Sequence, residues 1–243
     1  MENLEKILKK NKTITLYLTA NYPNRDDFFK NLDILVDGGM DILELGIPVK
    51  NPHLDGNTIV NTHRKVLEEG FNEIILVKLL RKIRGRYPSL PLVIMAYTEG
   101  IERYKLLSKG EYYDAILCPD EYLSIEDDRV PLIQIYNDQM DETAIKERTL
   151  NNRGFGYVMS GCGATGSKGE LSNGYISVIK KTRRHSSIPL QIGFGIYSPT
   201  QVKTVLRNGA DGVIIGSEII RKIDENNDVQ LRRYVESLTK ARG

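Results

Sequence analysis

The sequence predicts an α/β protein, a (β/α)8 TIM barrel that occupies residues 1–243 as a single domain. Three observations indicate this fold. Short apolar segments alternate with helical ones, eight such units fit into 243 residues, and several apolar segments are nearly continuous, as is typical of parallel strands covered on both faces. An open, doubly wound sheet is the alternative, but eight regular units without a long insertion favour closure.

The predicted strands are short apolar runs. They cover residues 14–19, 41–46, 91–96, 113–118, 131–136, 154–160, 188–194 and 211–216. The predicted helices cover residues 24–37, 57–69, 72–86, 100–109, 141–152, 173–186, 199–208 and 228–241. Asn24 is a suitable cap for the first of these helices, and Ser198 followed by Pro199 is typical of a helix start.

The fourth unit differs from the others. Residues 119–131, about thirteen in number, are all that separate its strand from the next. A crossover between parallel strands usually needs a dozen or more residues, helix included. The sequence therefore predicts a degenerate fourth helix of one turn at most.

Composition and charge exclude several classes of function. The net charge is +2, with 27% charged and 40% hydrophobic residues, and the basic residues are scattered, so neither nucleic acid nor an anionic membrane is an expected partner. No apolar run approaches the roughly 20 residues of a membrane span, and the charged start of the chain has no apolar core for export. We expect a cytoplasmic protein.

Cysteine and histidine give no sign of a disulfide framework or a metal centre. Cys118 and Cys162 are far apart and form no CxxC motif. The three histidines, His53, His63 and His185, do not form a ligand cluster, and we expect His63 and His185 on the surface. No metal site is predicted.

Two acids mark the expected mouth of the barrel. Glu44 stands near the end of the second strand, and Asp55 follows in the next loop, so both belong to the face where such barrels place their active sites. Glu44 lies among leucines, which should raise its pKa and suit it to proton transfer. Asp55, in a polar loop, should stay ionised and stabilise developing positive charge. The alternatives are an internal ion pair for Glu44 and a turn or cap role for Asp55.

Glycine-rich loops follow the last three strands. They read GATGSKG, GFGIYSP and GSEII, and Ser217 opens a short helix in the third. Barrels often hold a phosphate group between these loops and the start of such a helix, because glycine lets backbone N–H groups approach an anion. Three such loops at one corner favour a phosphate site, although each alone is explained by a tight turn. Tyrosines at 17, 97 and 157 are expected to line the interior.

The order and spacing of these motifs resemble the tryptophan synthase alpha subunit family. The resemblance covers essentially the whole chain and depends on DILELGIP followed by DG, ATG after the sixth strand, GFGI and SP after the seventh, and ADGVIIGS at the eighth. It implies a lyase that cleaves indole-3-glycerol phosphate to indole and glyceraldehyde 3-phosphate in tryptophan biosynthesis. It also implies no metal or organic cofactor in this chain, with pyridoxal phosphate only on a partner beta subunit of an α2β2 hetero-oligomer.

The resemblance also assigns roles to individual residues. By similarity, Glu44 exchanges protons with the substrate, Asp55 hydrogen-bonds the indole N–H, and Tyr157 lies beside the substrate. Tyr17 falls where an aromatic residue packs on the indole, with an ordinary barrel-filling role as its alternative. The remaining predicted substrate- and phosphate-binding residues are Thr165, Gly166, Phe194, Gly195, Gly216 and Ser217.

The loop after the second strand departs from the family pattern. Asn51 replaces an aspartate that helps to couple the family to its beta subunit, and His53, Leu54 and Asn57 also differ. These departures leave two alternatives open: a stand-alone lyase that releases free indole, and a non-catalytic barrel that activates a beta subunit. An isomerase would need its own acid/base pair on other strands, and a prenyltransferase would need acids that bind Mg²⁺ near a diphosphate. The pairing of Glu44 with Asp55 argues against both.

Overall fold

The computed structural model describes residues 2–9, 12–124, 130–159 and 172–243. Its centre is one eight-stranded parallel sheet with the strand order β4-β3-β2-β1-β8-β7-β6-β5. The strands are β1 (Thr13–Thr19), β2 (Ile42–Gly46), β3 (Leu92–Met95), β4 (Ala115–Leu117), β5 (Ile135–Tyr136), β6 (Gly156–Met159), β7 (Leu190–Gly193) and β8 (Gly212–Ile215). The predicted parallel sheet is confirmed.

The sheet closes into a barrel between β4 and the segment that leads into β5. Ile116 forms a parallel bridge with Leu132. The Ile116 N–H donates to the carbonyl of Pro131, and the Ile133 N–H donates to the carbonyl of Ile116, each across 2.9 Å. These contacts join the two outer strands, so the predicted barrel is confirmed over the open sheet.

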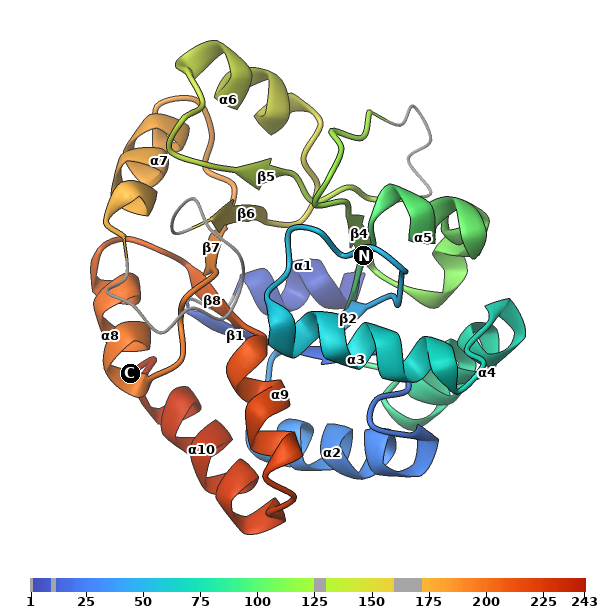
Figure 1. Ribbon diagram of the computed structural model, residues 1–243. Coiled ribbons are helices and arrows are strands. Elements are labelled where there is room, and N and C mark those ends of the chain that lie inside the picture. Colours follow the sequence, from blue (N-terminus) through green and yellow to red (C-terminus); the bar gives the residue numbers. More distant parts are fainter. Residues whose placement is uncertain (1, 10–11, 125–129, 160–171) are drawn as a thin grey trace.

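Helices form a ring around the strands (Figure 1). They are α1 (Glu2–Leu8), α2 (Arg25–Asp37), α3 (Asn57–Glu68), α4 (Glu73–Arg86), α5 (Thr98–Arg103), α6 (Glu142–Leu150), α7 (Gly174–Arg183), α8 (Pro199–Arg207), α9 (Ser217–Asp224) and α10 (Asp228–Lys240), with a 3-10 helix, η1 (Leu106–Tyr112). The predicted caps are present: Asn24 accepts from two first-turn N–H groups of α2, and Ser198 forms a capping box with Gln201 on α8.

Three differences from the sequence prediction have local causes. The helix expected over 100–109 is interrupted, because Lys105 takes a left-handed backbone with φ of 49° between α5 and η1. The fifth strand is shorter than expected, and its first part forms only the bridge at Leu132. Helix α1 was not predicted; its Leu4 is completely buried and packs near Gly154, just before β6, so this helix lies behind the strands in Figure 1.

The fourth unit lacks a regular helix in its described part. Residues 118–124 and 130–134, which lie between β4 and β5, contain no helical residue. This agrees with the predicted degenerate fourth helix. No helix among the described residues has the length and apolar character needed to cross a membrane.

Candidate active site

A cavity opens at the carboxyl-terminal ends of the strands and brings most of the predicted site residues together. The empty space in and above it amounts to about 810 Å³, part of which is open solvent. The predicted residues that line it are Tyr17, Glu44, Asp55, Tyr157, Phe194, Gly195, Gly216 and Ser217. Thr165 and Gly166 lie outside the described residues.

Glu44 lies on the wall of this cavity, within the barrel. It occupies the middle of β2, beside Tyr17 on β1 and Val93 on β3, and only 4% of its surface is exposed. Burial, and then the negative charge of Asp55, raise the pKa of Glu44 from 4.5 to about 8. The predicted upward shift is therefore present, and Glu44 is protonated near pH 7.

Asp55 is more enclosed than its sequence context predicts. Its polar neighbours in the sequence predict an open loop, but only 9% of Asp55 is exposed, and the Tyr97 hydroxyl contacts it. The Tyr97 hydroxyl donates to Asp55 Oδ2 across 2.9 Å and accepts from the Leu54 N–H across 3.2 Å. Burial and the Asp55 charge raise the pKa of Tyr97, so it remains a donor. Such a donor favours the ionised carboxylate.

Two tyrosines reach across neighbouring strands where glycine leaves room. A Cβ atom at Gly46 on β2 would lie 2.0 Å from the Tyr17 hydroxyl, and one at Gly193 on β7 would lie 2.2 Å from the Tyr157 hydroxyl. Each tyrosine can therefore occupy this position only because the next strand has no side chain there. Burial raises the pKa of Tyr157, followed by the charge of Glu44, which indicates that this hydroxyl and the glutamate share one part of the cavity.

His63 was expected on the surface, and this prediction is wrong. It is completely buried on the inner face of α3. The Val49 N–H donates to His63 Nδ1 across 3.2 Å, so Nε2 carries the proton of the neutral ring and donates to the Tyr17 hydroxyl across 3.3 Å. Burial lowers the pKa of His63 to about 4 and keeps it neutral.

The hydrogen bonds continue from Tyr17 into the helix. Tyr17 contacts the Thr19 hydroxyl across 3.2 Å, and Thr19 contacts the Thr62 hydroxyl across 2.6 Å. Thr62 in turn donates to the carbonyl of Ile59 across 2.7 Å. This buried chain fixes the Tyr17 ring and ties β1 to α3.

The phosphate corner, defined here as Phe194, Gly195, Gly216 and Ser217, also lines the cavity, and Gly216 lies next to Tyr17. Phe194 and Gly195 both have left-handed backbones, with φ of 68° and 74°, and this turns the chain sharply after β7. Gly216 precedes α9 and has no side chain to cap it. The first-turn N–H groups of α9, together with the Ser217 hydroxyl, therefore suit an anion.

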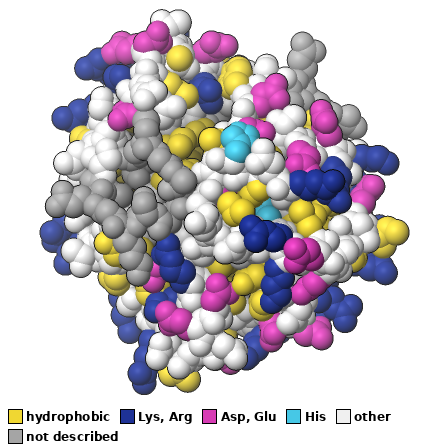
Figure 2. Space-filling view, viewed as in Figure 1, with side chains coloured by type: hydrophobic (Ala, Val, Ile, Leu, Met, Phe, Trp, Pro, Cys, Tyr) yellow, Lys and Arg dark blue, Asp and Glu magenta, His cyan; other side chains and the backbone are white. Residues whose placement is uncertain are grey.

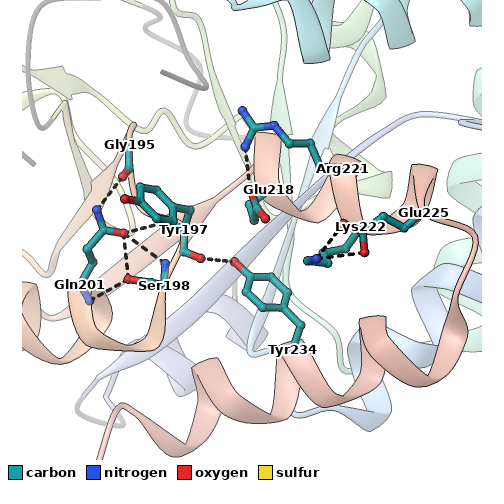
Figure 3. Close-up of polar contacts among 9 residues, drawn as sticks. All are labelled: Gly195, Tyr197, Ser198, Gln201, Glu218, Arg221, Lys222, Glu225 and Tyr234. Atoms are coloured by element: carbon teal, nitrogen blue, oxygen red, sulfur yellow. Dashed lines mark hydrogen bonds and ion pairs between the residues drawn. The ribbon is translucent and has the colours of Figure 1, made fainter. Parts of the chain in front are cut away.

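Side chains behind the phosphate corner hold its first loop in shape (Figure 3). Gln201 on α8 donates to the carbonyl of Gly195 across 3.2 Å and accepts from the Tyr197 N–H across 2.9 Å. Tyr234 on α10 donates to the carbonyl of Tyr197 across 2.8 Å. Hydrogen bonds from α8 and α10 thus fix the conformation of this loop before any ligand binds.

Two further charged side chains line the cavity and were not predicted as site residues. Glu218 and Arg221 on α9 form an ion pair, with Nη1 of the arginine 2.6 Å from Oε2 of the glutamate. Both could have been predicted from the sequence, because they follow Ser217 by one and four residues on the same short helix. No group of three metal-ligating side chains lies together in the part of the chain that the structure describes.

Charge on the surface around the mouth is mixed. Figure 2 shows basic and acidic side chains interspersed on this face. This agrees with the net charge of +2 and gives no broad field of one sign. Recognition of an anion therefore depends on groups inside the cavity.

The family model described as "Tryptophan synthase alpha chain" matches residues 4–242. The tryptophan synthase alpha chain of Methanoregula boonei is 30% identical over 255 residues, covering 96% of this chain and 95% of that protein.

Solved structures share the fold. A chain from the tryptophan synthase α2β2 complex of Pyrococcus furiosus superposes with a TM-score of 0.83 at 26% identity, covering 95% of this chain and 99% of that one. A chain of Mycobacterium tuberculosis tryptophan synthase gives a TM-score of 0.85 at 22% identity, with 98% and 97% covered.

Proposed function

The chain belongs to the tryptophan synthase alpha chain family, and from this premise we infer how its cavity works. The protein is a carbon–carbon lyase of tryptophan biosynthesis that cleaves indole-3-glycerol phosphate to indole and glyceraldehyde 3-phosphate. The observation that carries the assignment of its site is the pairing, in one cavity, of a glutamate whose pKa is about 8 with the buried Asp55 and a phosphate corner.

Glu44 acts first as an acid. Its protonated carboxyl delivers a proton to C3 of the indole ring, which turns the ring into a cation with the positive charge on N1. A carboxyl with a pKa near the working pH is suited to give and then take back a proton. Burial keeps it in the acid form when the substrate arrives.

Bond cleavage then restores the aromatic ring. Glu44, now ionised, takes the proton of the hydroxyl on the carbon attached to C3. The O–H electrons form the aldehyde carbonyl of glyceraldehyde 3-phosphate, and the electrons of the broken carbon–carbon bond return to the ring and neutralise N1. The proton that Glu44 gave is recovered, so the residue is ready for the next turnover.

Asp55 stabilises the intermediate between these two steps. Its carboxylate accepts a hydrogen bond from the indole N–H and opposes the positive charge that forms on N1. Tyr97 fixes the carboxylate through the 2.9 Å hydrogen bond described above. Tyr17 packs on the indole, and Tyr157 contacts the substrate next to Glu44.

The phosphate corner holds the other end of the substrate. Backbone N–H groups at Gly195, Gly216 and the start of α9 bind the phosphate group with the Ser217 hydroxyl. Thr165 and Gly166, from the loop after β6, complete the site in this proposal. The reaction needs neither a metal nor an organic cofactor in this chain, and pyridoxal phosphate belongs to the partner.

The protein works with a tryptophan synthase beta subunit in an α2β2 assembly. Family membership does not favour a stand-alone lyase or a non-catalytic activator. The exposed Asn51 and His53 lie in the loop that carries Asp55, so this loop connects the outer surface directly with the site. We place the protein in the cytoplasm, where this biosynthetic reaction would supply the partner with indole.

The test is product formation from indole-3-glycerol phosphate by the purified chain, alone and with its beta subunit. We expect indole and glyceraldehyde 3-phosphate in equal amounts, with faster formation when the partner is present. A chelator should leave the rate unchanged. Fast release that the partner does not alter would instead support a stand-alone lyase, and no release in either case would refute the lyase reaction.

A further inference from the structure

The ion pair on α9 has no role in the reaction described above, yet it lies in the cavity. Among the charged side chains of the described residues that line the cavity, Arg221 is the only cation, beside Glu44, Asp55 and Glu218. Glu218 is nearly buried, and 27% of the Arg221 side chain is exposed. The pair is therefore partly shielded from water, where charge interactions are stronger than on an open surface.

Helix geometry places Arg221 over the phosphate corner. Arg221 follows Ser217 by four residues, so the two side chains lie on the same face of α9. Side chains on a helix tilt toward its amino-terminal end. A long arginine side chain at this position therefore reaches back toward the first turn of α9. The Ser217 hydroxyl and the backbone N–H groups that suit an anion lie in that turn.

The neighbouring cation is placed differently. Lys222 pairs with Glu225 across 2.7 and 2.9 Å, on another side of α9 (Figure 3). It borders a separate surface hollow next to Asp228 and does not line the cavity. Lys222 is thus a matched control on the same helix.

The negative charge of Glu218 opposes the binding of a phosphate group. A phosphate monoester carries nearly two negative charges at pH 7, and a carboxylate in the first turn of α9 repels it. Arginine can resolve this conflict, because its planar guanidinium has several N–H donors and binds carboxylate and phosphate oxygens equally well. The pair can thus pass from a contact within the protein to one shared with the phosphate.

We propose that Arg221 binds the phosphate group of the substrate, and that its guanidinium passes from the ion pair with Glu218 to the phosphate oxygens when the substrate binds. The proposal rests on the proposed function, since the phosphate is the part of indole-3-glycerol phosphate that meets α9. Arg221 makes the site selective for a phosphate monoester over a neutral glycerol chain.

The experiment measures binding of sn-glycerol 3-phosphate, which carries the phosphate without the indole, by isothermal titration calorimetry. The proteins are the wild type, Arg221→Met, Arg221→Lys, Glu218→Gln and Lys222→Met. We expect Arg221→Met to weaken binding about tenfold or more, as for loss of a charge-assisted hydrogen bond. Arg221→Lys should recover part of the loss, Glu218→Gln should bind equally well or more tightly, and Lys222→Met should change binding less than twofold.

A purely structural ion pair gives a different pattern. Glu218→Gln and Arg221→Met would then weaken binding together, and this result would overturn the proposal, as would wild-type affinity in Arg221→Met. Binding of free indole serves as the check on the fold and should stay within twofold in every variant. Arg221-dependent binding in a wild type that releases no indole would support this inference while refuting the proposed function.

Discussion

Replacing Glu44 with glutamine should change how stability depends on pH. The carboxyl has a pKa of 4.5 in an ordinary setting and of about 8 in the fold. The native state therefore favours the protonated form, and it loses stability as pH rises from about 4.5 through about 8. Linkage over this interval gives a loss on the order of 4 kcal/mol between pH 5 and pH 9 in the wild type, which Glu44→Gln lacks.

The assay is urea unfolding followed by circular dichroism at pH 5, 7 and 9. The difference in free energy of unfolding between Glu44→Gln and the wild type should grow in favour of the variant by about 4 kcal/mol across this range. Glu69→Gln, which changes an exposed glutamate at the end of α3, is the control and should follow the wild type. A difference that stays constant from pH 5 to pH 9 would refute the assignment of a buried, protonated Glu44.

Three further predictions concern the reaction. Glu44→Gln and Asp55→Asn should each lower kcat at least ~100-fold, the low end of acid–base contributions, and losses below about threefold in both would contradict the assigned roles. The wild-type kcat/KM should fall as pH rises above about 8, because Glu44 must be protonated when the substrate binds. A flat profile from pH 7 to 10 would contradict this order of steps. Ser217→Ala should raise KM about tenfold with little change in kcat, and an unchanged KM would exclude the hydroxyl from phosphate binding.

The barrel could be predicted because its signals are local. Apolar runs of strand length, helix caps such as Asn24 and Ser198, and the short connection after β4 are each properties of a few consecutive residues. Once the barrel was predicted, the position of the glycine loops and of the two acids could be predicted too, because this fold places all these loops at one end.

Other features depend on contacts between distant residues. Asp55 is buried because Tyr97, forty-two positions later, reaches over it, and no short motif records that contact. The break at Lys105 arises from a left-handed backbone in a residue that is normally a good helix former. The packing of Leu4 near Gly154 joins the two halves of the chain.

The burial of His63 follows from a pattern that is visible in the sequence. It lies on one face of α3 with Ile59, Thr62 and Val66, and all four are buried. This spacing is typical of the inner face of an amphipathic helix, so the burial of His63 could have been predicted. Its bond to the Tyr17 hydroxyl could not, because that bond depends on how α3 packs against β1.

In this mechanism, Glu44 and Asp55 act together to cleave the substrate that the phosphate corner holds. The most direct test is single-turnover release of indole from indole-3-glycerol phosphate by the wild type, Glu44→Gln and Asp55→Asn, each assembled with the beta subunit. This mechanism predicts indole from the wild type and at least ~100-fold slower release from both variants, with substrate still bound. Equal release from all three proteins would contradict it.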